Sequence, residues 1–237
     1  RLRRDEVLRK VIEHAPSIYP YVWQSYSKES NLYFGDHIVK SKEGVQQGDP
    51  LGPLLFSLGI NDLIGRCKSH FNIWYLDDGT LGGTVEDVFS DYNAIVNSKE
   101  SLGLTVNPSK SEIMIINEDP LTSQQIMDRF SAITPRIKRI YNEDLTLLGS
   151  PINKESMEKI MLPKLESLKL MTSRLESIDS HEALFLLKNA FSIPKLTYFM
   201  RTSHLFMEPH ILEKFDKVLQ ESLQTIQNTK LDETSWD

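Results

Sequence analysis

The chain has 237 residues, of which 40% are hydrophobic and 25% charged, so it can fold around an apolar core. A single cysteine excludes an intramolecular disulfide framework and a zinc site built on several cysteines. The net charge of −6 argues mildly against nucleic-acid binding, but it does not show how the charges are arranged. No apolar run reaches membrane-spanning length, and no signal peptide is recognisable. We therefore expect an intracellular protein, nuclear or cytoplasmic, with no membrane partner.

The first quarter of the chain alternates helical and extended patterns. Apolar residues recur at helical spacing over residues 4–14. Two short extended runs within residues 31–45 surround a Gly-Asp pair, which predicts a β-hairpin. A polar turn with two glycines, residues 46–52, then leads into an apolar helix over residues 54–64.

The next segment repeats this alternation. Residues 71–81 contain two apolar or aromatic runs around Asp77-Asp78-Gly79, a strand–turn–strand pattern. An amphipathic helix is predicted over residues 85–102, with Gly103 as its left-handed C-terminal cap. Short strands are expected at residues 104–106 and 112–116. The order of elements predicts an α+β domain with an antiparallel sheet.

The second half of the chain reads as a small helical bundle. One helix is predicted over residues 157–178, kinked or divided at Pro163. A second helix, over residues 179–191, would begin with a capping box formed by its first residue and Glu182. A third helix follows Pro209.

Two adjacent acids, Asp77 and Asp78, mark the tip of the second predicted hairpin. Side chains converge at a tight turn, so two neighbouring carboxylates can approach one point in space. They would repel each other without a cation between them, and hard oxygen ligands suit Mg²⁺. The competing interpretation is a solvated hairpin turn, which is what most Asp-Gly pairs form.

Two other loops could contact phosphates or bases. In the turn before the apolar helix, Gln47 beside Gly48 could hydrogen-bond a sugar or a base, while the helix N-terminus favours phosphate. Lys110, in the loop within residues 102–114, could neutralise or protonate a pyrophosphate leaving group. Taken singly, these features also fit an ordinary loop and a solvated lysine.

In this order, the segments resemble the reverse transcriptase domain of non-LTR retrotransposons. The matching segments are motif B (residues 44–61), motif C (75–78), motif D (102–114), motif E (147–152) and the thumb (180–202). The resemblance covers nearly the whole chain. It implies a polymerase palm with an antiparallel sheet and flanking helices at residues 1–152, followed by an α-helical thumb bundle at residues 153–237.

The resemblance implies an RNA-templated DNA polymerase that transfers deoxynucleotides to a primer 3′ end. Its partners would be an RNA template, a DNA primer and dNTPs, and its cofactor two Mg²⁺ ions. Metal-binding or catalytic roles are implied for Asp77, Asp78 and Lys110. Contacts with the incoming nucleotide or the primer end are implied for Gln47, Gly48, Tyr75 and Leu76, and contacts with the primer strand for Leu148 and Gly149.

The sequence departs from the family pattern in two ways. Relatives often carry Arg where Gln46 stands, which is expected to weaken one template or phosphate contact. The family's motif A, which supplies a further metal-binding aspartate, is expected just before residue 1, together with the fingers. Asp5 is expected to cap the first helix instead of replacing that aspartate. Because two-metal transfer needs carboxylates from both motifs, we expect this chain alone to polymerise negligibly.

Two alternatives remain open at this stage. A retroelement remnant or a co-opted module would keep the fold and bind nucleic acid without catalysis. An RNA-templated RNA polymerase or an intron-encoded maturase would share the palm chemistry. Magnesium-dependent primer extension separates the first alternative from the polymerase, and nucleotide preference separates the second.

Overall fold

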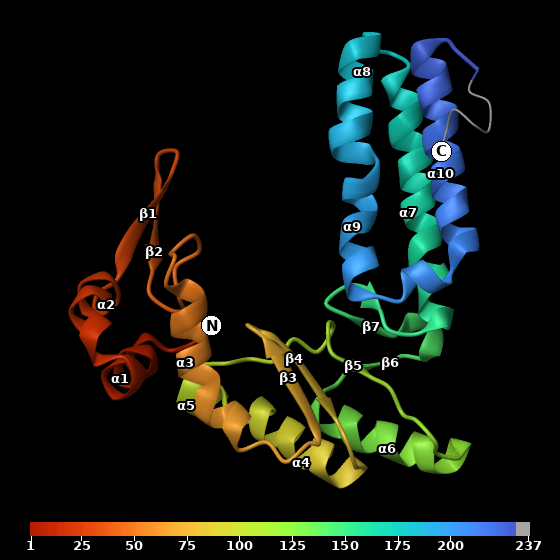
Figure 1. Ribbon diagram of the computed structural model, residues 1–237. Coiled ribbons are helices and arrows are strands. Elements are labelled where there is room, and N and C mark those ends of the chain that lie inside the picture. Colours follow the sequence, from red (N-terminus) through yellow and green to blue (C-terminus); the bar gives the residue numbers. More distant parts are fainter. Residues whose placement is uncertain (231–237) are drawn as a thin grey trace. The chain divides into compact units, whose positions relative to one another are not determined.

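The structure is a computed structural model that describes residues 1–230. The chain divides into two compact units. The first unit comprises residues 1–113 and 117–138, and the second comprises residues 114–116 and the chain from residue 139 onward. The range 153–237 expected for a thumb extends beyond the described residues. Helices and strands are labelled in Figure 1.

Three helices of the first unit pack around one apolar core. They are α1 (Arg4–His14), α2 (Tyr19–Tyr26) and α3 (Gly52–Gly65). As predicted, α1 ends just before a proline, and a short 3₁₀ turn (Pro16–Ile18) follows. The core side chains include Leu2, Val7, Val11, Val22, Tyr26, Leu55 and Ile60, all under 5% exposed.

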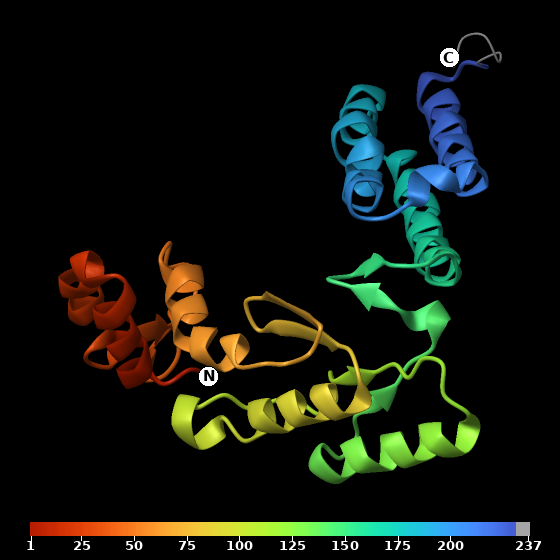
Figure 2. The same cartoon turned by 60° about the horizontal axis from the view of Figure 1, so that its bottom comes forward.

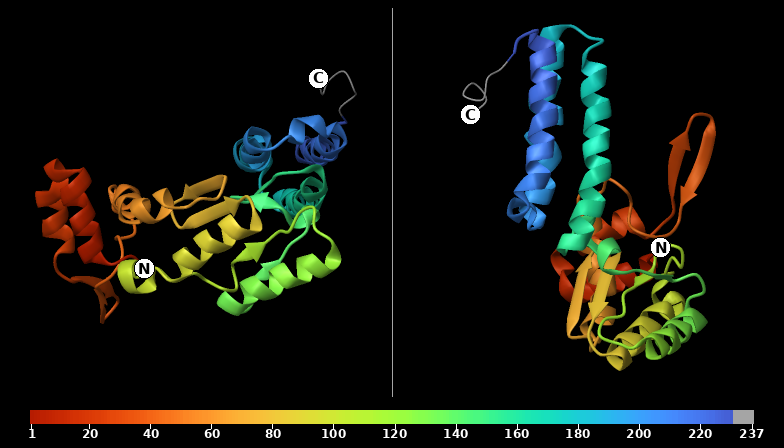
Figure 3. Two further views of the ribbon diagram at one scale, coloured as in Figure 1. Left: turned by 90° about the horizontal axis from the view of Figure 1, so that it is seen from below. Right: turned by 90° about the vertical axis from the view of Figure 1, so that its right-hand side faces the viewer.

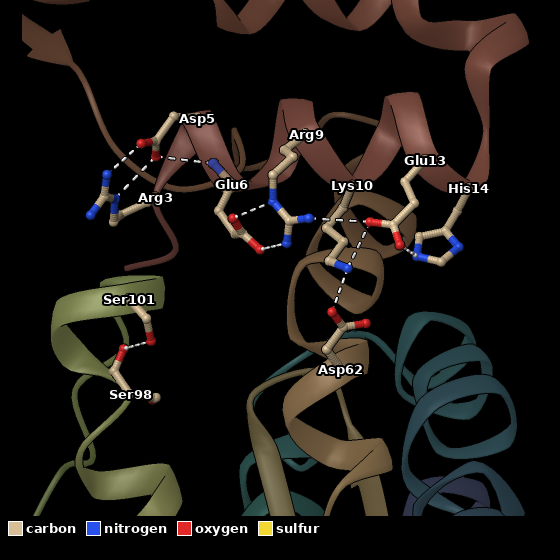
Figure 4. A network of polar contacts seen from close by, with 10 residues as sticks. All are labelled: Arg3, Asp5, Glu6, Arg9, Lys10, Glu13, His14, Asp62, Ser98 and Ser101. Atoms are coloured by element: carbon tan, nitrogen blue, oxygen red, sulfur yellow. Dashed lines mark hydrogen bonds and ion pairs between the residues drawn. The ribbon is translucent and has the colours of Figure 1, made fainter.

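An ion pair made by a buried lysine also joins α1 to α3. Lys10 of α1 is 1% exposed, and its ammonium group contacts Glu13 at 2.9 Å and the Asp62 carboxylate of α3. Figure 4 shows Lys10 between these two acids. Asp5 does not cap α1: Arg3 occupies the N-cap position, and the Asp5 carboxylate pairs with the Arg3 guanidinium.

Both predicted hairpins of the first unit are present. β1 (Ser30–Phe34) pairs antiparallel with β2 (His37–Ser41), and β3 (Phe71–Tyr75) with β4 (Asp78–Gly82). The strands form separate two-stranded sheets, so the antiparallel pairing is confirmed but one continuous palm sheet is not seen among the described residues. The mixture of helices and strands agrees with an α+β fold.

The helices after β4 differ from the prediction. The helix expected over residues 85–102 is interrupted, giving α4 (Val85–Val96) and α5 (Lys99–Leu102). Near the break the Ser98 hydroxyl donates to the Ile95 carbonyl at 2.6 Å, a local bond that competes with helix continuation. Gly103 caps α5 with a φ of 79°, as expected.

A helix that was not predicted follows, α6 (Pro120–Ile133). Its signal is present in the sequence: the Asp119 carboxylate accepts hydrogen bonds from the N–H groups of Leu121 and Thr122, with proline at the first helical position. Helices α4 and α6 lie side by side in Figures 1 and 2. Residues 104–106 form no strand, and the expected strand at residues 112–116 is reduced to β5 (Glu112–Ile113), which pairs with β6 (Lys138–Arg139).

The second unit begins with a small hairpin and continues as a helical bundle. The hairpin consists of β7 (Thr146–Leu147) and β8 (Ser150–Pro151). The helices are α7 (Lys154–Leu175), α8 (Ser180–Leu186), a π-helical segment (Leu187–Phe191), α9 (Ile193–Thr202) and α10 (Pro209–Gln227). Figure 3 shows α7 and α10 packed lengthwise around their shared core. The bundle predicted from periodicity is therefore confirmed.

Two details of this bundle correct the sequence analysis. Pro163 does not divide α7, because it lies on the exposed side while the opposite face is held in the core. Asp179 is the N-cap residue of α8, but its side chain makes no capping hydrogen bond, so the predicted capping box does not form. Among the described residues, no helix combines the length and apolar character that a membrane span requires.

A buried carboxylate holds the loop that leads into β3. Asp91 of α4 is 5% exposed and accepts hydrogen bonds from the Lys68 N–H at 2.8 Å and from the Ser69 N–H and hydroxyl at 2.7 and 2.6 Å. Burial alone would raise the pKa of Asp91, but these three donors outweigh it and hold the pKa below its ordinary value. The loop before β3 is therefore fixed to α4 by an ionised side chain.

Replacing Asp91 with asparagine is expected to lower the free energy of unfolding at neutral pH by about 1–3 kcal/mol. Because the folded pKa is depressed, ionised Asp91 stabilises the fold above its ordinary pKa of 3.8, and this stabilisation is lost as the pH falls through the folded value. The difference between wild type and Asp91→Asn should therefore shrink below about pH 4. Urea unfolding between pH 3 and 7 measures this difference in the free energy of unfolding. Asp36→Asn, at an exposed position, is the control. An equal difference between wild type and Asp91→Asn at pH 3 and at pH 7 would contradict the stabilising role of the ionised Asp91.

Candidate functional site

The loop before α3 forms a tight turn that presents Gln47. The Asp49 N–H donates to the Gln46 carbonyl at 3.3 Å, and Gly48 has a φ of +87°, as the third position of a type II turn requires. Gln47 occupies the second position, is exposed, and makes no side-chain hydrogen bond within the described part of the chain. A Cβ on Gly48 would meet no atom within 4 Å, so the space beside the turn is open.

The buried side chain of Tyr26 holds the Gln47 turn in place through hydrogen bonds. The Tyr26 hydroxyl donates to the Asp49 carboxylate and accepts from the Gln46 N–H at 3.1 Å. Tyr26 is 2% exposed, and its burial, together with the hydrogen bond to Asp49, raises its pKa to about 12. The hydroxyl therefore stays protonated as a donor at neutral pH. The other Asp49 oxygen accepts from the Leu51 N–H at 2.9 Å, which joins the turn to the start of α3.

Gln46 turns inward instead of outward. Its side-chain amide lies 3.3 Å from the Ser30 hydroxyl and 3.5 Å from the Ser25 carbonyl, at the base of the β1–β2 hairpin. At the position where relatives often carry Arg, this chain thus has a side chain engaged within the protein.

The β3–β4 hairpin carries the two adjacent acids. Tyr75 pairs with Asp78, so the two-residue loop is Leu76-Asp77, one residue earlier than the predicted turn. Leu76 has a φ of 55°, a positive value that glycine normally supplies in a two-residue hairpin loop. A leucine there costs roughly 1–2 kcal/mol. Strained backbone of this kind is found preferentially at functional sites.

Asp77 and Asp78 are both exposed, and neither side chain has a hydrogen bond or ion pair among the described residues. Two neighbouring carboxylates without a counter-charge suit a hard cation, although Mg²⁺ takes about six oxygen ligands. Within residues 1–230 no group of three or more His, Cys, Asp or Glu side chains is placed to hold a metal. The pair could therefore supply only part of the oxygen ligands of a magnesium ion, and the remainder would have to come from other groups.

The hairpin is anchored on its inner face by Trp74. The Trp74 indole N–H donates to the Asn72 side chain at 2.8 Å, and the Asn72 amide donates to the Ile64 carbonyl of α3 at 3.0 Å. Trp74 faces Gly79 across the ladder, and a Cβ on Gly79 would lie 2.6 Å from the indole ring. The glycine after the two aspartates is therefore required by this packing. Tyr75 points to the opposite face and is 63% exposed.

Lys110 stands on a compact loop of the first unit. The Asn107 side chain accepts from the Ser109 N–H at 3.1 Å, and the Asn107 carbonyl accepts from the N–H groups of Lys110 and Ser111. This Asx turn leaves Lys110 exposed, and its side chain has no partner in the described part of the chain.

The turn predicted to hold a primer lies in the second unit, between β7 and β8. Leu148 and Gly149 have φ values of 51° and 79°, which is the type I′ pattern of a two-residue hairpin. Helix α9 fixes this turn: the Tyr198 hydroxyl donates to the Leu148 carbonyl at 2.5 Å, and the Thr202 hydroxyl donates to the Ser150 hydroxyl at 2.9 Å. Sequence analysis missed Tyr198 and Thr202, because no local pattern links a helix to a turn about 50 residues earlier.

The first unit thus contains three of the predicted sites, each on its own loop: the Gln47 turn, the Asp77–Asp78 hairpin and the Lys110 turn. Among the described residues, no hydrogen bond or ion pair connects the side chains of these three loops. Each is positioned separately, by Tyr26, by Trp74 and by Asn107.

The chain belongs to the reverse transcriptase (RNA-dependent DNA polymerase) family, whose model matches residues 4–158. The chain is similar to the retrotransposable element SLACS 132 kDa protein of Trypanosoma brucei gambiense, with 23% identity over 185 residues. This match covers 76% of the chain but only 15% of that protein. No solved structure matches the chain. The resemblance found in the sequence is therefore confirmed at the level of the family.

Proposed function

We propose that this chain is part of an RNA-templated DNA polymerase of a non-LTR retrotransposon. Membership of the reverse transcriptase family and the similarity to a retrotransposable element protein support this function. The observation that carries the proposal is the pair Asp77 and Asp78, exposed and uncompensated at the tip of a hairpin whose backbone is strained at Leu76. In this proposal residues 1–152 are the palm and residues 153–237 the thumb.

Asp77 and Asp78 would hold the two magnesium ions through their carboxylates. When bound, the metal ions supply a lowered pKa for the attacking primer hydroxyl and charge stabilisation for the leaving pyrophosphate. Because the two acids are neighbours at the end of one hairpin, both carboxylates could approach the same bound ion.

The substrate contacts follow from the exposed loops. Gln47 offers an amide that can donate to and accept from the incoming dNTP, and Gly48 leaves room for a flat sugar or base. Lys110 would neutralise or protonate the pyrophosphate. The primer end would lie against Tyr75 and Leu76, and the primer strand against the turn of Leu148 and Gly149. The RNA template is the remaining partner.

Two carboxylates alone form an incomplete ligand set for two bridged cations. Because the described residues place no third acid with Asp77 and Asp78, we propose that efficient transfer needs a further carboxylate and that this chain by itself polymerises negligibly. The same observation favours a second candidate function, a non-catalytic retroelement remnant or co-opted module that binds nucleic acid.

Primer extension on an RNA template, with the full chain in excess and Mg²⁺ present, tests the proposal. We expect at most trace extension, which Asp77→Ala abolishes, because the variant loses a metal-binding carboxylate. Asp36→Ala, at the tip of the β1–β2 hairpin, is the matched control and should extend like wild type. Salt-sensitive binding of template and primer without extension would instead favour the non-catalytic module.

A further inference from the structure

The turn that follows α6 holds an arginine in a backbone conformation that suits glycine. The Ile137 N–H donates to the Thr134 carbonyl at 3.2 Å, which closes a turn with Pro135 in second position. Arg136, in third position, has a φ of 76°. A type II turn requires this positive φ, and glycine or asparagine normally supplies it. The chain therefore keeps a charged, long side chain at a position where it is conformationally unfavourable.

Both ends of this turn are held in the first unit. Thr134 is 3% exposed and its hydroxyl accepts from the Tyr92 hydroxyl of α4 at 2.7 Å. Ile137 is 7% exposed and packs inward. The surroundings thus impose the conformation of Arg136, whose side chain is exposed and has no hydrogen bond or ion pair among the described residues. Strain that the surroundings enforce points to a role for the residue that bears it.

The Arg136 turn leads straight into the neighbourhood of Lys110. The Lys138 N–H donates to the Ser111 carbonyl at 2.9 Å, which brings the strand after Arg136 beside the Lys110 loop. Arg136 and Lys138 are both exposed, whereas Ile137 between them is buried. Glu112 lies 3.6 Å from the Lys138 ammonium group and offsets part of its charge.

We infer that Arg136 and Lys138 extend the Lys110 loop into a phosphate-binding surface. The planar guanidinium group of Arg136 can bind two phosphate oxygens at once, and the two lysines add positive charge around it. The net charge of the chain is −6, whereas these three exposed side chains, on neighbouring segments, are all positively charged. This inference rests on the proposed function and deepens it, since it names residues that would hold phosphates of the nucleic-acid backbone or of the nucleotide beside Lys110.

The substitution Arg136→Gly gives the proposal a two-sided test on the full chain. It removes the cation and relieves the backbone strain, so we expect Tm to rise by about 2–4 °C. Affinity for a fluorescein-labelled RNA–DNA hybrid should fall by roughly 3–10-fold at 0.1 M salt, and the slope of log K against log salt should decrease by about one. If Arg136 had only a structural role, Arg136→Gly would change Tm but not the slope of log K against log salt.

Three comparisons complete the experiment. Arg136→Lys keeps the charge and should keep the slope, while Asn117→Gly changes another residue of positive φ without removing charge and should leave binding unaltered. A parallel titration with a fluorescent dNTP distinguishes the sources: a loss confined to the hybrid indicates backbone phosphates, and a loss confined to the dNTP indicates the triphosphate. Unchanged binding of both probes by Arg136→Gly would overturn this inference alone. If the wild-type chain bound neither the hybrid nor the dNTP, both this inference and the proposed function would be contradicted.

Discussion

Replacing Arg4 with methionine is expected to lower the free energy of unfolding of the first unit by about 2–4 kcal/mol. The Arg4 guanidinium is 8% exposed and donates to the carbonyls of Gly44, Lys28 and Ser41 at 3.1, 3.2 and 3.0 Å, and to the Ser41 hydroxyl at 2.8 Å. Methionine keeps much of the volume but donates no hydrogen bond. Several polar groups would then be left without a partner, each at a cost.

The loss of stability should be largest in the segments that the Arg4 guanidinium group connects. Lys28 lies just before β1, and Ser41 is the last residue of β2, so both stand at the base of the β1–β2 hairpin. This hairpin extends away from the helices of the first unit in Figures 1 and 3. Gly44 stands two residues before the turn that presents Gln47. We therefore expect amide hydrogen exchange over residues 28–47 to accelerate in the variant.

Urea unfolding and hydrogen exchange together check this prediction. Arg66→Met is the matched control, because Arg66 is exposed and its side chain has no hydrogen bond or ion pair among the described residues. It should change the free energy of unfolding by less than about 0.5 kcal/mol. An Arg4→Met chain with unchanged exchange over residues 28–47 would show that the hairpin base is held by other contacts.

Replacing Gly79 with valine is expected to destabilise the β3–β4 hairpin by about 1–3 kcal/mol, because the new side chain overlaps the Trp74 ring. The ideal Cβ already lies 2.6 Å from two atoms of that ring, and the indole is tied to Asn72 and cannot move freely. The hairpin also carries Asp77 and Asp78, so magnesium-dependent extension should decline with it.

A second substitution separates a steric effect from a general loss of strand quality. If the overlap is the cause, Trp74→Leu should recover part of the stability in the Gly79→Val background, with a coupling energy of about 0.5–3 kcal/mol in a double-mutant cycle. Gly65→Ala is the control, since a Cβ there meets no atom within 4 Å. Additive effects of the two substitutions would mean that the Trp74–Gly79 contact is not what requires glycine.

Elements that end at a single decisive residue could be predicted from the sequence. Pro16 ends α1, Gly103 caps α5 with left-handed backbone, and the Gly-Asp pair at residue 35 turns β1 into β2. Each depends on a local backbone preference that the neighbouring chain does not change.

Elements that depend on competing contacts could not be predicted from the sequence. The helix expected over residues 85–102 is interrupted between Val96 and Lys99, and α7 passes through Pro163 while its other face is buried. Asp78 and Gly79 belong to β4 and not to the turn, since pairing of Tyr75 with Asp78 sets the loop one residue earlier. Strand register depends on the partner strand and on the packing of Trp74, neither of which is a local property.

By itself, the sequence indicated the family of this protein, because segments such as Gln47-Gly48, Asp77-Asp78 and the Lys110 loop follow one another in an order that resembles reverse transcriptase motifs. Only the tertiary structure decided how those loops are held. Tyr26 beneath the Gln47 turn and Tyr92 on Thr134, beside the strained Arg136, act through contacts between segments far apart in the chain, and Trp74 over Gly79 acts across the paired strands of one hairpin. Such contacts follow no sequence period, since they arise from the folding of separate elements onto one another.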